Sequence, residues 1–188
     1  MEWKLKKQSK AALEADAQPR VAVFAGSFDP FTIGHLDLVQ RAAGLFDILF
    51  VVVAQNASKK NMFDAETRAA LVEKAVETIP NVRVAVHDGL TVDFMKTVGA
   101  RYLVRGIRNA SDLDAEQAVA WNNKALNPDI ETVFLMSAQE HLVVSSTVVR
   151  ELLKCGVENV TNASGRKDIL LHFVPKNIIP MLLKLYRK

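Results

Sequence analysis

Short apolar runs alternate with stretches of helical spacing along most of this chain, and this alternation constrains its fold more than any other feature. The run at 48–54 is apolar nearly throughout, which is typical of a strand that is covered on both faces. Between the runs, apolar residues recur every three or four positions, as at Leu36, Val39 and Ala43. We expect five strands, at 21–25, 48–54, 82–86, 102–104 and 132–136.

The intervening segments carry the start and stop signals of helices. They predict a first helix ended by Gly44 as its C′ residue, a second from the cap Asp64 to about Ile79, and a third over 92–98 closed by Gly99. A fourth helix is predicted from Ser111 to about Ala125, a fifth from Ser146, and a last one over 176–186. Together these elements predict an α/β fold: a Rossmann-like, doubly wound, five-stranded parallel sheet with C-terminal helices. Such sheets bind ligands beyond the carboxyl ends of their strands, so the site should follow positions 25, 54, 86, 104 and 136.

Length and composition fit one domain. Of 188 residues, 49% are hydrophobic and 24% charged, which are ordinary globular values. We interpret residues 1–19 as an N-terminal extension and 20–188 as a single domain, with a longer polar connection at about 156–171. No apolar run approaches a membrane span, and a net charge of +3 argues against a general nucleic-acid binder. The single cysteine, Cys155, and the absence of a signal peptide indicate the cytoplasm.

The first expected strand runs into Gly26-Ser27-Phe28-Asp29-Pro30-Phe31-Thr32-Ile33-Gly34-His35. Glycine lets backbone amides approach a phosphate closely, and Ser27 adds a hydroxyl donor. Gly34 and His35 stand where a helix begins, and a helix N-terminus favours an anion. An imidazole there can donate a hydrogen bond to a phosphate as charge develops on phosphorus, which would make His35 a stabiliser of the transition state.

Three cations at strand ends support a phosphate site. Residues 21–149 carry eleven bases and fifteen acids, so this section is acidic by four charges. Lys59 is a flexible point charge, whereas Arg105 and Arg108 present bidentate forks. Because bulk charge would repel a polyanion, their placement after the second and fourth strands is better explained by bound phosphates. Ser145 and Ser146 would cap a helix whose N-terminus faces the same anion.

These motifs together resemble a known superfamily. The Gly-Ser-Phe-Asp-Pro string followed by Thr32-Ile33-Gly34-His35 is similar to the nucleotidyltransferases with a (His/Thr)-x-Gly-His signature, and its Thr form resembles the phosphopantetheine adenylyltransferase family. Later motifs agree in order: Ser58-Lys59-Lys60-Asn61-Met62-Phe63, Arg105-Gly106-Ile107-Arg108-Asn109, Ser145-Ser146-Thr147-Val148-Val149-Arg150, and His-Phe-Val-Pro from His172.

The resemblance implies transfer of the adenylyl group of ATP to 4′-phosphopantetheine, giving dephospho-coenzyme A and pyrophosphate. It implies Mg²⁺ brought with ATP rather than a dedicated metal site, and a homohexamer. By the family pattern the catalytic residues are His35, Lys59 and Arg108, and the pantetheine substrate meets Ser27, Lys59, Thr91 and Arg105. The ATP contacts are Ser27, Phe28, His35, Gly106, Ile107, Arg108, Glu116, His141, Leu142, Val143, Val144, Ser145, Ser146 and Thr147.

Some residues depart from the family pattern. Thr91 replaces an apolar residue, Ala115 a common aromatic, and His141 a frequent tryptophan. Two alternatives stay open from the sequence. One is an adenylyl- or cytidylyltransferase for another phosphorylated acceptor, such as nicotinamide mononucleotide, although those relatives usually carry His at the position of Thr32. The other is a nucleotide-binding regulator without turnover.

Overall fold

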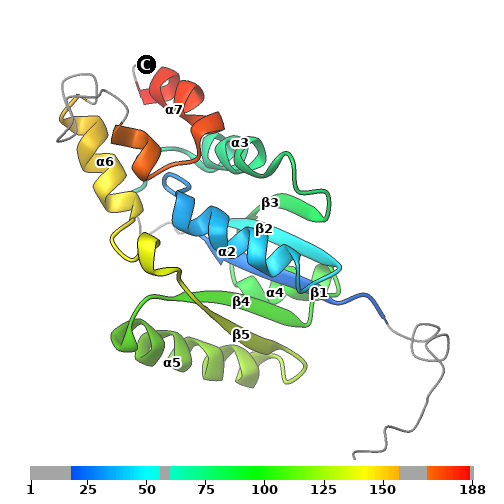
Figure 1. Cartoon of the computed structure of the whole chain (residues 1–188). Coiled ribbons are helices and arrows are strands. Elements are labelled where there is room, and N and C mark those ends of the chain that lie inside the picture. The colour runs from blue at the N-terminus through cyan, green and yellow to red at the C-terminus, as the bar shows by residue number, and fades with distance from the viewer. Residues whose placement is uncertain (1–17, 56–59, 157–168, 187–188) are drawn as a thin grey trace, which may run out of the picture.

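A single parallel sheet organises the chain (Figure 1). The computed structural model describes residues 18–55, 60–156 and 169–186. Its strands lie in the order β3-β2-β1-β4-β5 and are β1 (Val21–Gly26), β2 (Ile48–Gln55), β3 (Val82–Asp88), β4 (Tyr102–Ile107) and β5 (Glu131–Met136). All four neighbouring pairs are parallel. Because the chain proceeds from β1 to one edge and then returns to the other side of β1, the sheet is doubly wound, which confirms the predicted fold class.

Helices cover both faces of this sheet. They are α2 (Ile33–Ala43), α3 (Ala65–Val76), α4 (Thr91–Thr97), α5 (Ala110–Leu126), α6 (Ser146–Lys154) and α7 (Ile179–Tyr186), with single 3₁₀ turns η1 (Gln139–His141), η3 (Ile169–His172) and η4 (Lys176–Ile178). Alternate residues of β1 point to opposite faces. Ala22 and Phe24 join a cluster with residues of α2, α3, α6 and α7, whereas Val23 packs against α4.

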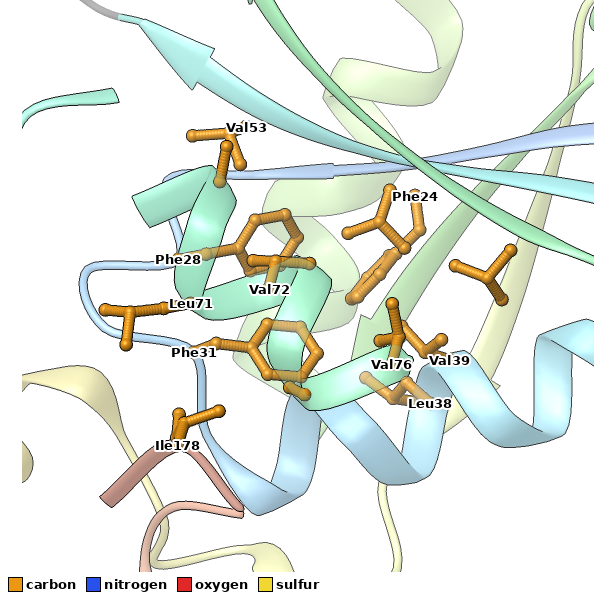
Figure 2. Packing of buried hydrophobic residues seen from close by; sticks show 14 of the residues in the cluster. Phe24, Phe28, Phe31, Leu38, Val39, Val53, Leu71, Val72, Val76 and Ile178 are labelled. Carbon is orange, nitrogen blue, oxygen red and sulfur yellow. The ribbon is translucent and has the colours of Figure 1, made fainter. Parts of the chain in front are cut away.

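The larger cluster is aromatic where it approaches the carboxyl end of β1. Phe24, Phe28 and Phe31 lie together there, each at most 5% exposed. Figure 2 shows Leu71 and Val72 of α3 beside the rings of Phe28 and Phe31. The turn that follows β1 is therefore anchored in the core rather than lying free on the surface.

Several predicted helix ends are confirmed. Asp64 caps α3, and its Oδ1 accepts a hydrogen bond from the Thr67 N–H at 2.7 Å. Gly99 adopts a φ of +65° just beyond α4, a conformation that favours glycine. The strands are confirmed within two residues at each end, except that β4 continues to Ile107.

Other helix ends differ from the prediction. Gly44 has a φ of −75° and is the right-handed C-cap, so it is not a left-handed C′ residue. Helix α5 begins at Ala110, because Asn109 rather than Ser111 accepts the capping hydrogen bond, from the Asp112 N–H at 2.9 Å. Helix α3 ends at Val76, three residues early, and the predicted helix over 176–186 opens with the 3₁₀ turn η4.

Two predicted features fall mainly beyond the described ranges. The proposed N-terminal extension at 1–19 is described only from residue 18, and the polar connection at about 156–171 lacks residues 157–168. Within the ranges that the structure does describe, no helix combines the length and apolar character needed to cross a membrane.

Candidate active site

A cavity of about 560 Å³ opens at the carboxyl ends of β1 and β4, where the strand order reverses. Its wall combines the turn after β1, the start of α2, the end of β4, the first turns of α5 and the segment from η1 to α6. The structure thus brings most of the predicted site residues to one place. Those lining the cavity are Ser27, Phe28, His35, Thr91, Arg105, Gly106, Arg108, Glu116, His141, Val144, Ser145 and Ser146.

The other predicted residues that the structure describes do not line the cavity. Ile107 is only 2% exposed within the core, and its carbonyl accepts a hydrogen bond from the Ser137 N–H at 2.8 Å. Leu142 and Val143 are exposed and do not line the cavity. Thr147 is also exposed, and its hydroxyl accepts a hydrogen bond from Arg150 at 2.9 Å. Lys59 lies outside the described residues.

The turn after β1 has an unusual backbone. Phe28 has a φ of +46°, in the left-handed region that bulky side chains rarely adopt. Its ring folds back beneath Gly26, where a Cβ would come within 2.9 Å of Phe28 Cε1. Glycine at position 26 is therefore required by the phenylalanine ring, and not only by an approaching phosphate.

Thr32 and His35 fix one another at the start of α2. Thr32 is the N-cap, and its hydroxyl accepts a hydrogen bond from the His35 N–H at 3.3 Å. In return, the Thr32 N–H donates to Nδ1 of the imidazole at 3.1 Å. A backbone N–H can only donate, so Nδ1 is the acceptor and Nε2 carries the proton of the neutral ring.

Aromatic rings enclose this imidazole. The centroids of Phe28, Phe31 and Phe24 lie 5.1, 5.4 and 6.5 Å from that of His35. Burial, and secondarily the charge of Arg108, lower the pKa of His35 to about 4. At neutral pH the side chain is therefore an uncharged hydrogen-bond donor in the wall of the cavity.

The charge state of His35 leads to a pH prediction. The ring should stay neutral from pH 8 to about 5, so NMR titration of its Cε1–H signal should show a midpoint near 4 and no inflection near 6.5. The pKa of His35 is lower in the folded protein than in the unfolded chain, so the neutral ring stabilises the fold fully above pH 6.5. This stabilisation is lost as the pH falls toward 4. A His35 midpoint near 6.5 would contradict the buried environment.

Both predicted arginines are paired with carboxylates of α5. Arg105 donates from Nε to Glu116 at 2.6 Å, with a second bond from Nη2, and its Nη1 donates to the Ala25 carbonyl at 3.0 Å. Arg108 donates from Nε to Asp112 at 2.8 Å, and this pairing raises the pKa of Arg108 and lowers that of Asp112. Glu116, which the family pattern gives as an ATP contact, lines the cavity and also pairs with Arg105.

The start of α6 completes the wall. Ser145 is the N-cap of α6, and its hydroxyl accepts a hydrogen bond from the Val148 N–H at 3.3 Å. Ser146 instead donates to the Pro30 carbonyl at 2.8 Å, which ties α6 to the turn after β1. The predicted caps thus have two different roles.

His141 packs over Gly34 at the start of α2, with its Cβ 3.6 Å from the position that a Cβ at Gly34 would take. Its Nδ1 is buried without a hydrogen-bond partner among the described residues. Leaving such an atom unpaired is costly, so the geometry favours a ligand or water partner at this corner.

Sequence reasoning missed other residues of this region. Asn61, Asp112 and Ser137 also line the cavity. Ser137 directly follows β5, and Asp112 stands four residues after Arg108, so strand ends and helical spacing could have identified both. In the described part of the chain, histidine, cysteine and carboxylate groups do not gather in threes as a metal site would require.

Comparison with known proteins agrees with this architecture. Residues 23–152 match the cytidylyltransferase-like family. A phosphopantetheine adenylyltransferase of Streptococcus pneumoniae is 50% identical to this chain, in a match that covers 73% of this chain and 85% of the relative. One of Leuconostoc mesenteroides is 42% identical, in a match that covers 86% of this chain and 93% of the relative. A solved bifunctional NMN adenylyltransferase/ADP ribose pyrophosphatase of Francisella tularensis shares the fold, with a TM-score of 0.62 at 13% identity over 90% of this chain and 52% of that one.

The family match runs from within β1 into α6, so it includes every strand end that carries a motif. Sequence identity of 42% and 50% over most of both chains is more than a shared fold alone implies. The chain therefore belongs to the phosphopantetheine adenylyltransferase family, as Thr32 to His35 and the later motifs predict.

Proposed function

We propose that this protein transfers the adenylyl group of ATP to 4′-phosphopantetheine, giving dephospho-coenzyme A and pyrophosphate. The observation that carries the proposal is the placement of His35, whose Nδ1 accepts a hydrogen bond from the Thr32 N–H, at a cavity that is also lined by Arg105 and Arg108. Relatives named phosphopantetheine adenylyltransferase are up to 50% identical to this chain over the matched residues.

In the proposed reaction an oxygen of the acceptor phosphate attacks the α-phosphorus of ATP in line. A new phosphorus–oxygen bond forms as the bond to the pyrophosphate group breaks, and pyrophosphate leaves with that electron pair. His35 donates its Nε2–H to the α-phosphate oxygens as negative charge builds there, and Arg108, beside it, adds positive charge. Most of the catalysis is then positioning and electrostatic stabilisation.

The two substrates would divide the wall of the cavity. Ser27, Thr91 and Arg105, with Lys59, are proposed to hold the acceptor. The nucleotide would lie against Gly106, His35 and His141, with the start of α6 at Ser145 and Ser146 beside them. In this arrangement the acceptor phosphate and the α-phosphate meet near His35.

Mg²⁺ is proposed to arrive with ATP, where it would neutralise the charge of the phosphates. The carboxylates that line the cavity are Asp112 and Glu116, and each is engaged by an arginine. This pairing favours a metal carried by the nucleotide over one held by the protein. We also propose a cytoplasmic location, in keeping with a single cysteine.

A coupled pyrophosphate-release assay tests the function. With ATP and 4′-phosphopantetheine we expect turnover, and with nicotinamide mononucleotide as acceptor we expect little or none. Turnover with the mononucleotide alone would overturn the substrate assignment. ATP binding by calorimetry without pyrophosphate release on either acceptor would instead indicate a nucleotide-binding regulator. The relatives' names do not favour either alternative.

The protein is proposed to be a homo-oligomer, and a hexamer by its resemblance to the family. Helix α5 has no buried residue, and it exposes Leu113, Val119, Trp121 and Leu126. Trp121 alone is 66% exposed. A helix of this kind favours burial against another copy of the chain.

Light scattering coupled to size exclusion tests the assembly. The unmodified protein should have about six times the mass of one chain. Trp121→Glu should lower that mass, whereas Leu45→Glu, at an exposed position beyond α2, should leave it unchanged. A monomer at micromolar concentration would contradict the proposal.

A further inference from the structure

Arg68 is a charged residue in the interior of the protein. It lies on α3 and is 1% exposed, on the same side as the buried Ala65 and Val72. Arginine is rarely buried to this extent unless its guanidinium has several partners.

The partners of Arg68 are backbone carbonyls of three separate segments. Its Nε donates to the Phe63 carbonyl at 3.1 Å, and its Nη1 donates to the Ala54 carbonyl of β2 at 3.2 Å. The same Nη1 donates to the carbonyl of Ser27, which lines the cavity. One guanidinium thus joins the end of β2, the entry to α3 and the turn after β1.

Asp29 makes the reciprocal connection. It is 3% exposed, and its carboxylate accepts hydrogen bonds from the Met62 N–H at 2.7 Å and the Phe63 N–H at 3.1 Å. The turn 27–30 is therefore bound to the segment before α3 through its own side chain and through Arg68. We call Arg68 and Asp29 the turn clamp.

The turn clamp supports a strained backbone together with α6, from which Ser146 donates to the Pro30 carbonyl at 2.8 Å and Arg150 to the Asp29 carbonyl at 2.7 Å. A bulky residue at the φ of Phe28, +46°, is strained and persists only where its surroundings fix it. That φ places the ring of Phe28 edge-on to the imidazole of His35, with the centroids 5.1 Å apart. Movement of the turn would therefore change both the packing of His35 and the position of Ser27.

We propose that Arg68 and Asp29 are positioning residues for adenylyl transfer, because they hold the turn 27–30 in the conformation that packs Phe28 against His35 and places Ser27 at the cavity. Neither residue lines the cavity. The proposal rests on the proposed function, since positioning has its consequence in that reaction.

The chemistry of this position requires arginine. A guanidinium presents donors in a rigid fork and keeps its charge when buried, so it can hold carbonyls of three segments at once. Lysine has a single ammonium on a flexible stem and loses its proton readily at such depth. Methionine preserves much of the apolar stem without any donor. These differences make Arg68→Lys and Arg68→Met an informative pair.

The experiment compares both variants with Ile130→Ala, a control in the other core cluster, where Ile130 is 1% exposed among apolar residues. Steady-state kinetics give kcat and KM for each substrate, corrected for the folded fraction from urea titration. NMR follows the Cε1–H signal of His35, which is assigned by its loss in His35→Gln.

We expect Arg68→Met and Arg68→Lys to lower kcat by about ten- to hundredfold, the scale of a small misplacement in an active site. The His35 signal should shift, with its titration midpoint moving from about 4 toward 6.5. Ile130→Ala should lower stability but keep kcat within about twofold and the His35 midpoint unchanged, since its cluster contains neither the turn clamp nor the rings around His35.

An unchanged kcat and an unchanged His35 signal in folded Arg68→Met would overturn the proposal and leave Arg68 as a stabiliser of α3. If that variant does not fold, Asp29→Asn takes its place with the same readouts, because asparagine keeps one of the two acceptor oxygens. The NMR readout needs no substrate. Absence of turnover in the unmodified protein would therefore count against the proposed function, while the His35 signal would still decide on the turn clamp.

Discussion

Replacing His35 with alanine is expected to lower kcat by at least about a hundredfold in the pyrophosphate-release assay, with smaller changes in the KM values. Loss of one donor to a developing charge in a preorganised site has effects of about 10² to 10³ in kcat. The geometry favours an effect in this range, because the Thr32 N–H and three phenylalanine rings hold the imidazole with its Nε2 proton available.

The control for this variant is His172→Ala, which removes an exposed histidine of η3 and should leave kcat unchanged. Thr32→Val is more specific: it keeps the backbone N–H that donates to Nδ1 but removes the hydroxyl, which caps α2 and lies 3.0 Å from Nδ1. Its kcat should lie between those of the unmodified protein and His35→Ala. If His35→Ala retained full activity, the imidazole would have no part in stabilising the transition state.

Replacing Phe31 with alanine is expected to have the largest effect on stability, a loss of about 3–5 kcal/mol in the free energy of unfolding. The side chain is fully buried, and its ring centroid lies 5.4 Å from those of both Phe28 and His35. Figure 2 shows the ring of Phe31 between the turn after β1 and α3. Urea titration followed by circular dichroism measures the loss.

Leu45→Ala is the matched control, since Leu45 is 46% exposed in the turn after α2. Its free energy of unfolding should change by about 0.5 kcal/mol or less. A loss below about 1 kcal/mol in Phe31→Ala would mean that the aromatic cluster repacks around the missing ring. That outcome would also weaken the role given to the cluster in holding His35.

Much of the fold could be predicted because its signals are local. The strand at 48–54 is recognisable from an apolar run, and Asp64 from its position before an amphipathic segment. The start of α5 could not be predicted in this way, because Asn109 and Ser111 are both capable caps within one turn. Which of the two residues caps the helix depends on the residue at which β4 ends.

The candidate site could be located but not fully described. Parallel strands end at a common edge, so residues after β1 and β4 were certain to meet once those strands lay side by side. The pairing of Arg105 with Glu116 depends on how α5 packs on β4. The two residues are eleven positions apart, and that separation does not indicate a contact in the sequence. Arg68 carried a signal that was overlooked, since it stands among apolar residues on the buried side of α3.

The two arginine–carboxylate pairs at the cavity mouth have a consequence for binding entropy. A free arginine side chain samples many rotamers, and ordering it on a ligand costs up to about 2 kcal/mol. Glu116 and Asp112 restrict Arg105 and Arg108 to a few rotamers when the protein folds, before any nucleotide arrives. The carboxylates thus weaken the electrostatic attraction for phosphate. They also remove most of the entropy cost of ordering the arginine side chains when phosphate binds.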